Sequence, residues 1–261
     1  MILEKIAYRT AQRVAELKQQ KPQEQVMAEA NALDPKTGFP FENALRADGL
    51  SFICEIKRAS PSKGVIAEDF PYMQIAKEYE AAGAAAISVL TEPHWFLGQN
   101  SFLTEISQEV KLPLLRKDFT VDSYQIYEAK LIGASAVLLI CALLNTSALK
   151  EYLAIAHSLG LSALVEAHTE EEVRSALEAG ARVIGVNNRN LKTFEVDITT
   201  SVRLRALVPD NILFVSESGI KTPADVARLK ANKTDALLIG ETLMRSANKQ
   251  EELAILRGDR V

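Results

Sequence analysis

Short runs of branched aliphatic residues alternate with amphipathic stretches from residue 50 to near the end of the chain. Each run has the length of a buried strand, and each following stretch has apolar residues at helical spacing. The predicted strands are 51–57, 85–90, 113–118, 135–140, 162–166, 182–187, 212–217 and 235–239. The predicted helices are 71–82, 101–109, 122–132, 146–159, 169–179, 198–207, 222–231 and 241–255. Such alternation requires parallel pairing through crossover helices.

Residues with strong capping preferences mark several of the predicted helix starts. Asp122, Asn145 and Thr169 precede helical stretches, and Thr222-Pro223 combines an N-cap residue with proline at the first helical position. Eight strand–helix units most simply close into a TIM barrel, because an open doubly wound sheet usually has fewer strands and a glycine fingerprint after the first one. We therefore predict an α/β fold, a single (β/α)8 TIM barrel over residues 49–261.

A helical and irregular segment precedes the first predicted strand. Apolar residues between Ile2 and Leu17 have helical spacing, and prolines from Pro22 to Pro40 then interrupt the pattern. We interpret residues 1–48 as an N-terminal helical extension of one domain that spans residues 1–261.

Composition and charge narrow the class of protein. With 261 residues, 48% of them hydrophobic, the chain can bury the core of one barrel. A net charge of −4 without a basic cluster argues against nucleic acid as a partner. No stretch approaches 18 apolar residues without charges, and the first residues lack the apolar core of a signal peptide. We expect a cytoplasmic protein without a membrane partner.

Histidine and cysteine spacing predicts no metal site. His94, His157 and His168 are far apart in the chain, and His168 is expected at the rim of the barrel. Cys54 and Cys141 lie in apolar runs, as reduced and packed thiols do. Because the chain also lacks dinucleotide and Walker motifs, we expect neither a metal nor another cofactor.

The first predicted strand ends in charged residues that share one face. Strand side chains alternate, so Glu55 and Lys57 point to one side while Cys54 and Ile56 point to the other. Burying either charge against helices without a partner would cost roughly several kcal/mol, which favours placing both toward the barrel interior. An ion pair at the rim of an edge strand is the alternative.

Other predicted strands end in polar residues at the same end of the barrel, where TIM barrels place their chemistry. Lys117, Glu166 and Glu217 come from the third, fifth and seventh strands, and Asn187 and Arg189 from the sixth. Odd strands contribute to the same interior layers. Lysines and glutamates that converge on one mouth must perturb each other's pKa values, which favours a catalytic cluster over a structural one.

Residues next to this cluster indicate an aromatic pocket and a separate structural pair. Phe96 and Phe119, with Trp95, lie in loops after the second and third strands. A flat apolar ligand and the packing of a lid would each explain them. Arg116 and Asp118 flank Lys117 and should face away from it, as a pair with a neighbouring loop or helix.

Glycines at the last two strand ends predict a phosphate site. Ser218-Gly219 and Ile239-Gly240-Glu241 each precede a helix, and bare main-chain amides in these loops can hold a phosphate. A tight turn that needs a positive φ is the alternative explanation of each glycine. With the loop 60–64, they form a predicted phosphate cup beside the charged cluster.

Ordered motifs along almost the whole chain resemble the indole-3-glycerol phosphate synthase family. They are EIKRASPSKG at 55–64, SVLTE at 88–92, LLRKDF at 114–119, LVEAHTEEE at 164–172, IGVNNRNL at 184–191, SESGI at 216–220 and LLIGETLM at 237–244. Their order and spacing leave little room for another barrel family. The resemblance implies a carboxy-lyase of tryptophan biosynthesis that closes 1-(2-carboxyphenylamino)-1-deoxyribulose 5-phosphate to indole-3-glycerol phosphate, with loss of carbon dioxide and water.

The resemblance also implies a role for each site residue. Catalytic roles are implied for Glu55, Lys57, Lys117, Glu166, Asn187 and Glu217. Substrate or phosphate binding is implied for Ser60, Arg189, Ser218, Gly219, Ile239, Gly240 and Glu241, and an aromatic pocket for Phe96, Phe119, Leu138 and Leu191. It favours Lys117 as the acid for condensation, Lys57 as the acid for dehydration and Glu166 as the base. Near Glu241, main-chain amides should contact the phosphate, because a carboxylate would repel it.

Two other functions remain open from the sequence. A phosphoribosylanthranilate isomerase, or another phosphate-binding barrel enzyme, would lack the second converging lysine and the N-terminal extension. A non-catalytic phosphometabolite-binding protein would not require proton-transfer groups with perturbed pKa values. In each case the expected partner is a small phosphorylated molecule. The sequence does not determine the oligomeric state, but it is compatible with a monomer.

Overall fold

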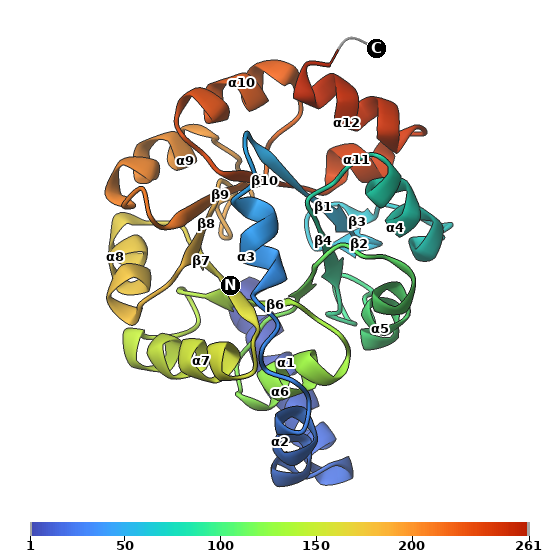
Figure 1. Ribbon diagram of the computed structural model, residues 1–261, viewed down its shortest axis with the longest axis vertical. Helices are drawn as coiled ribbons and strands as arrows, with labels where there is room; N and C mark the ends of the chain where they lie inside the picture. Colours follow the sequence, from blue (N-terminus) through green and yellow to red (C-terminus); the bar gives the residue numbers. More distant parts are fainter. Residues whose placement is uncertain (1, 260–261) are drawn as a thin grey trace.

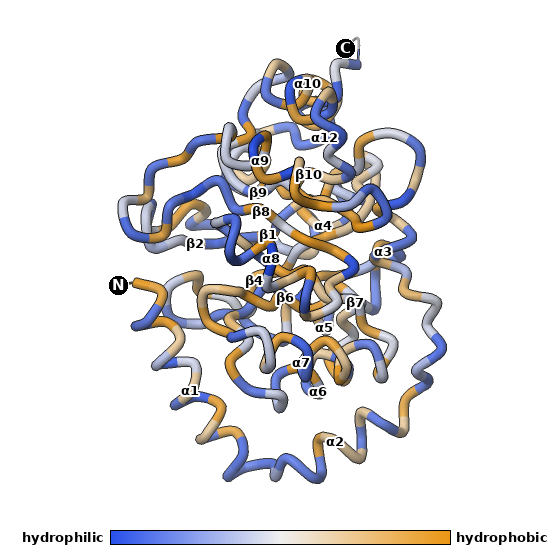
Figure 2. The backbone as a smooth tube through the Cα atoms, turned by 90° about the vertical axis from the view of Figure 1, so that its left-hand side faces the viewer, coloured by the Kyte–Doolittle hydropathy of each residue, from blue (hydrophilic) through white to orange (hydrophobic). Residues whose placement is uncertain are grey.

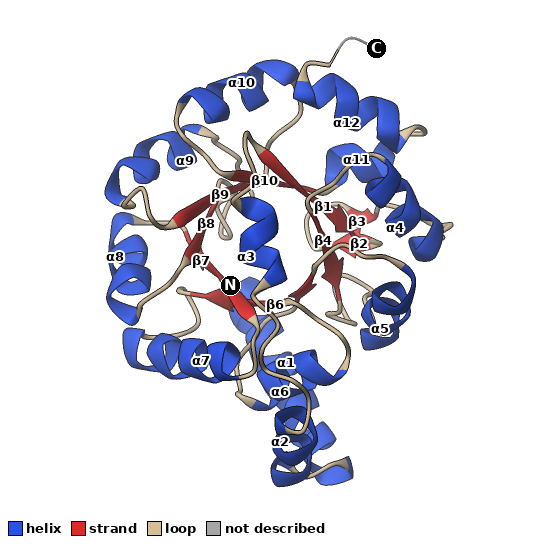
Figure 3. Cartoon of the chain, in the orientation of Figure 1, coloured by secondary structure: helices blue, strands red, loops and turns tan. Residues whose placement is uncertain are grey.

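The structure, a computed structural model, describes residues 2–259. Within them, eight parallel strands close into a barrel with helices around it (Figures 1 and 3), which confirms the predicted TIM barrel. The strands are β1 (Ser51–Ile56), β4 (Ala86–Leu90), β5 (Leu114–Lys117), β6 (Ala136–Ile140), β7 (Ser162–Ala167), β8 (Val183–Asn187), β9 (Leu213–Glu217) and β10 (Ala236–Ile239). β1 pairs with both β4 and β10, which closes the barrel.

The helices around the barrel follow the predicted order. They are α4 (Tyr72–Ala81), α5 (Asn100–Glu109), α6 (Tyr124–Leu131), α7 (Thr146–Ser158), α8 (Glu170–Ala179), α9 (Thr199–Leu204) with the 3₁₀ turn η1 (Arg205–Leu207), α10 (Pro223–Ala231), α11 (Glu241–Arg245) and α12 (Lys249–Arg257). The capping expectation is confirmed where Asn145, Thr169 and Thr222 each accept a main-chain N–H from the first turn.

The prediction of one helix over 241–255 is wrong, because the chain breaks between α11 and α12. Ser246 ends α11 in an extended conformation, with φ −71° and ψ 135°. Asn248 then begins α12 by accepting the main-chain N–H of Glu251 at 3.1 Å. An N-cap asparagine stabilises a new helix start at this position, and the two short helices pack where one long helix was expected.

Strand alternation produces two apolar cores, one on each side of the barrel wall. Cys54 and Ile56 of β1 belong to the outer core between strands and helices, as predicted, and the thiol of Cys54 is free. The inner core fills the interior with Ile53, Ala86, Leu115, Ala136, Leu138, Ile140, Leu164, Val183, Leu213, Val215, Ala236 and Leu238. Two residues further along β1, β5 and β7, the next inward positions are charged. The polar layer therefore begins where the apolar interior ends.

The N-terminal extension reaches both ends of the barrel. It contains α1 (Ile2–Gln20), α2 (Gln23–Asn31) and α3 (Pro40–Leu45), and Figure 2 shows it running along one side of the molecule. Phe41 and Leu45 of α3 are buried among the inner core residues, so α3 plugs the amino end of the barrel. α1 reaches the opposite end. Helices are predicted in this segment, but the plug is not.

The loop after β1 contains a short hairpin that the sequence pattern does not predict. It pairs β2 (Ala59–Ser60) with β3 (Gly64–Val65) in antiparallel fashion. The hairpin projects the predicted phosphate loop beside the barrel mouth. None of the helices in residues 2–259 has the length and apolarity needed to cross a membrane.

Candidate active site

A cavity of about 570 Å³ lies at the carboxyl ends of the barrel strands. Every residue predicted for the site lines it: Glu55, Lys57, Ser60, Phe96, Lys117, Phe119, Leu138, Glu166, Asn187, Arg189, Leu191, Glu217, Ser218, Gly219, Ile239, Gly240 and Glu241. Ile2, Leu3 and Ile6 of α1 also border the cavity and add apolar surface to its mouth. The barrel thus brings residues from all parts of the chain to one place, while the role of each remains a prediction.

Lys117 lies at the centre of the charged cluster. Its Nζ is 3.5 Å from Glu217, 3.8 Å from Glu55 and 3.9 Å from Glu166, measured to a carboxylate oxygen of each. Burial alone would lower the pKa of Lys117, but the carboxylates outweigh it and raise the pKa above its usual value. Lys117 is therefore an ammonium group at neutral pH, the state from which a general acid starts.

Glu55 and Lys57 form the closest ion pair of the cluster. Lys57 Nζ is 2.5 Å from Glu55 Oε1. Burial alone would raise the pKa of Glu55, but Lys57 and Lys117 lower it below its usual value. The pair lies inside a closed barrel, so the alternative of an edge-strand pair is wrong. A Cβ at Gly240 would lie 2.4 Å from Glu55 Oε1, so the close approach of this pair requires glycine at 240, whose φ is −117°.

The pKa of Glu217 is strongly affected by its surroundings. Burial raises its pKa to about 7, against the opposing effect of Lys117, and the charge of Glu166 adds to the rise. A Cβ at Gly185 on the neighbouring β8 would lie 2.2 Å from Glu217 Oε1. The glycine therefore leaves the space that Glu217 occupies in the barrel interior.

The raised pKa of Glu217 predicts a specific dependence of stability on pH. Its pKa is higher in the folded than in the unfolded chain, so folding binds a proton between about pH 4.5 and pH 7. The contribution of Glu217 to stability is complete below pH 4.5 and decreases as pH rises through 7. We expect Glu217→Gln to abolish this decrease, on the order of 2 kcal/mol between pH 5 and pH 8. Urea unfolding of both proteins at the two pH values measures it; identical pH dependence would contradict the assignment.

His168 directly follows the carboxyl end of β7 and lies beside Glu166 without lining the cavity. Its Nε2 is 3.6 Å from Glu166 Oε1, and its Nδ1 is 3.2 Å from Glu172 Oε2. Burial alone would lower the pKa of His168, but the hydrogen bond to Glu172 and the surrounding carboxylates raise it. The imidazole therefore supports the charge of Glu166 from the side away from the cavity.

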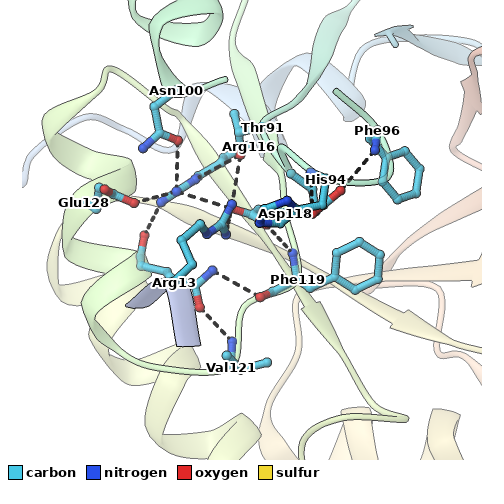
Figure 4. A network of polar contacts seen from close by, with 12 residues as sticks. Arg13, Thr91, His94, Phe96, Asn100, Arg116, Asp118, Phe119, Val121 and Glu128 are labelled. Carbon is cyan, nitrogen blue, oxygen red and sulfur yellow. Dashed lines mark hydrogen bonds and ion pairs between the residues drawn. The ribbon is translucent and has the colours of Figure 1, made fainter. Parts of the chain in front are cut away.

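The aromatic part of the cavity is a pair of rings. The centroids of Phe96 and Phe119 are 5.9 Å apart and their planes meet at 40°. Trp95 does not line the cavity. Arg116 and Asp118 form the predicted structural pair, 3.3 Å apart, and Arg116 also contacts Glu128 of α6, on the helix side of β5 (Figure 4).

The predicted phosphate cup is built on two successive residues with positive φ. Ser218 has φ 67° and Gly219 has φ 84°, so the tight-turn explanation holds here as well. The side chain of Asn188 holds the turn by donating to the carbonyl oxygen of Ser218 at 3.1 Å. Ile239 borders the cavity, but its side chain packs in the outer core, so its main chain is what a ligand could meet.

Sequence reasoning missed several basic residues of the cavity wall. Lys63, Lys221 and Arg245 line the cavity close to the phosphate cup. Lys63 lies inside the predicted phosphate loop 60–64, and Lys221 and Arg245 directly follow the motifs at 216–220 and 237–244, so their positions were the available signal. The carboxylate of Glu241 is 3.1 Å from Arg245 and 3.9 Å from Lys63, so these positive charges offset its negative charge.

Comparisons with known proteins agree with this geometry. One family model, described as indole-3-glycerol phosphate synthase, matches residues 3–256. The protein of that name from Ruminiclostridium cellulolyticum is 62% identical over 258 residues, which cover 99% of each chain. The one from Endomicrobium trichonymphae is 57% identical over 257 residues, which cover 98% of this chain and 100% of the relative.

Solved structures with low sequence identity share the fold. 3-Hexulose-6-phosphate synthase from Salmonella typhimurium has a TM-score of 0.65 at 13% identity, over 79% of this chain and 96% of its own. A chain of the tryptophan synthase complex from Pyrococcus furiosus has a TM-score of 0.59 at 14% identity, over 80% of this chain and 98% of its own. At such identities the likeness concerns the barrel alone.

Proposed function

The chain belongs to the indole-3-glycerol phosphate synthase family, and we propose that the charged cluster around Lys117 carries out the ring closure for which this family is named. The enzyme is a decarboxylating lyase of tryptophan biosynthesis. Its substrate, 1-(2-carboxyphenylamino)-1-deoxyribulose 5-phosphate, has a carboxylated ring at one end and a phosphate at the other. The observation that supports our assignment of roles is one ammonium group within 4 Å of three carboxylates in a cavity with an aromatic wall and a phosphate cup.

Condensation needs an acid. The ring carbon that bears the carboxylate attacks the sugar carbonyl carbon, a carbon–carbon bond forms, and the carbonyl oxygen takes a proton. We assign this proton to Lys117, because its ammonium is buried, fully protonated and placed between β1, β7 and β9. Loss of carbon dioxide then returns the electron pair of the broken carbon–carbon bond to the ring and restores its aromaticity.

Dehydration needs an acid and a base. The hydroxyl group made in the first step leaves as water with a proton from Lys57, while Glu166 removes a proton next to the ring nitrogen, so that the second double bond of the indole ring forms. Glu55 contacts both lysines, at 2.5 Å and 3.8 Å, and keeps the two ammonium groups in place. The products are indole-3-glycerol phosphate, carbon dioxide and water, which balance the substrate.

Binding of the phosphate fixes the substrate along the cavity. We assign it to the main-chain N–H groups near Gly219 and Gly240, with Lys63, Lys221 and Arg245 supplying positive charge. Asn187 accepts the main-chain N–H of Arg189 at 3.0 Å through its side-chain oxygen. Because Asn187 lines the cavity, we assign its amide NH₂ as a donor to the substrate.

Formation of indole fluorescence from the carboxyphenylamino-deoxyribulose phosphate tests the proposed function. Turnover that is lost when residues of the charged cluster are replaced supports the proposed function. Turnover of phosphoribosylanthranilate instead would indicate the isomerase, and binding without turnover would indicate a phosphometabolite-binding protein.

The phosphate cup predicts a selective loss of affinity in Gly219→Ala. A Cβ at this position would lie 2.3 Å from Val196 and would force an alanine into φ 84°. We expect the Kd of a phosphorylated product analogue to rise at least about tenfold, because the turn can no longer present its N–H groups. Isothermal titration measures it.

Gly180→Ala is the matched control for this variant. Gly180 has φ 89°, and nothing lies within 4 Å of a Cβ built there. Both variants should lose stability of about 1–2 kcal/mol through backbone strain, but only Gly219→Ala should lose affinity. Equal affinity in the two folded variants would remove Gly219 from the phosphate site.

A further inference from the structure

Phe96 and Phe119 form the aromatic wall of the cavity and come from different loops. The main-chain N–H of each donates a hydrogen bond to a buried carboxylate. Glu92 Oε2 accepts the main-chain N–H of Phe96 at 3.0 Å. Asp118 Oδ1 accepts the main-chain N–H of Phe119 at 2.9 Å. Glu92 and Asp118 are only 1% and 2% exposed, so both carboxylates are shielded from water next to the main chain of the two phenylalanines; of the two, Asp118 also borders the cavity.

Glu92 organises the entire loop that carries Phe96. Its Oε2 also accepts the N–H of Trp95 at 2.7 Å, and its Oε1 accepts the N–H of His94 at 2.9 Å. The carbonyl oxygen of Glu92 accepts the N–H of Gly98 at 2.8 Å, which closes the loop on itself. A carboxylate that accepts several N–H groups is a strong and directional anchor. The direction of Phe96 therefore depends on the acceptor oxygens of Glu92.

Asp118 connects Phe119 to the framework of the barrel. Its Oδ2 contacts Arg13 of α1 at 2.7 Å and Arg116 at 3.3 Å, and accepts the hydroxyl of Thr91 at 3.3 Å (Figure 4). Arg116 is itself fixed on the other side by Glu128 of α6 at 2.5 Å. These contacts fix the carboxylate of Asp118, and its hydrogen bond to the N–H of Phe119 in turn restricts the position of that residue.

We propose that Glu92 and Asp118 are positioning residues that set the separation and tilt of the Phe96–Phe119 pair, and so the fit of the substrate's aromatic ring. This inference rests on the proposed function, which places that ring between these side chains. Neither acid lies within the charged cluster. Their effect reaches the substrate through the main chain of the two phenylalanines, and for this reason it should appear in ring binding and not in the proton transfers.

Glu92→Gln and Asp118→Asn test the proposal with little change in shape. Each amide places an NH₂ group where the carboxylate oxygens now face N–H donors or a guanidinium, so the loop must shift. Two probes separate the effects: 1-(2-carboxyphenylamino)-1-deoxyribitol 5-phosphate, which has the ring, and ribulose 5-phosphate, which lacks it. We expect the Kd of the first to rise about tenfold and that of the second to change less than twofold. In turnover, KM should rise while kcat stays within about threefold.

Lys18→Met is the matched control. Lys18 ties α1 to Asp122 at 2.7 Å, near the same loop, without contacting either ring. It should leave both Kd values unchanged. If Asp118→Asn does not fold, Arg13→Met removes the closest partner of the same carboxylate, and a smaller loss confined to the ring-bearing probe is then expected.

Phe119→Leu separates the failure of this inference from that of the proposed function. If Phe119→Leu leaves the affinity for the ring-bearing probe unchanged, the ring is bound elsewhere and the aromatic part of the proposed function is wrong. If Phe119→Leu weakens it while Glu92→Gln and Asp118→Asn do not, the pocket stands and the positioning role is overturned. An equal loss for both probes in the acid variants would also overturn it, because a general loss of structure would explain that result.

Discussion

Lys117→Met is expected to lower kcat by ~10²–10⁴, the usual contribution of a general acid. Methionine keeps most of the side-chain volume and removes the only ammonium that contacts Glu55, Glu166 and Glu217 together among the described residues. Both carbon dioxide release and indole formation should slow, because condensation comes first. Single-turnover measurement of both products checks this. If turnover stays within about tenfold of the wild type in a folded variant, the role passes to Lys57.

The same variant should lose stability in a manner that depends on pH. Without Lys117, three carboxylates face each other in a buried space, and breaking a buried ion pair costs about 3–5 kcal/mol. Acidification protonates the carboxylates and should restore part of the loss. Lys57→Met is the comparison, since Lys57 contacts Glu55 alone within the cluster as described. A loss of stability that did not depend on pH would indicate that packing, and not charge, is the cause.

Glu166→Gln is expected to lower the rate of indole formation by ~10²–10⁴, because glutamine cannot accept the proton removed during dehydration. Carbon dioxide release in the first turnover should persist, since Lys117 remains in place for condensation. The two products are therefore expected to separate in time, with an intermediate that has lost carbon dioxide but retains its hydroxyl group. Rapid quench with detection of both products measures the separation.

Glu172→Gln is the control for this variant. Glu172 lies beyond His168, and its carboxylate contacts the imidazole and not the cavity. It should change the rate of indole formation far less than Glu166→Gln does. If carbon dioxide release and indole formation slow equally in Glu166→Gln, Glu166 acts in condensation, and another group is the base for dehydration.

The barrel could be predicted because its strands are buried on both faces. Apolar runs without alternation are typical of parallel strands, and each predicted strand boundary lies within one residue of the observed one. The inward direction of Glu55, Lys57 and Lys117 follows from strand alternation and from the cost of burying charges against helices. What remained out of reach was the distance between them, since the closure of the barrel sets it.

Features that depend on tertiary contacts could not be predicted. The plug residues Phe41 and Leu45 lie in a short segment between prolines and turns. The segment is too short for hydrophobic periodicity to show which of its side chains are buried. Glu92 ends the motif SVLTE, but the sequence does not indicate that its carboxylate accepts N–H groups two to four residues further along. The break before α12 did have a signal, since Asn248 with Glu251 three residues later resembles a capping pair.

The plug has a consequence for synthesis on the ribosome. α3 leaves the ribosome before any barrel strand, yet Phe41 and Leu45 pack in the same inner core as Leu213 of β9 and Ala236 of β10, close to the end of the chain. Contacts of such long sequence separation form late, because the intervening chain must first be ordered. A nascent chain is therefore expected to expose these two apolar side chains until β10 has paired with β1, an interval in which aggregation competes with folding. α3 is therefore made early but is expected to reach its final position late.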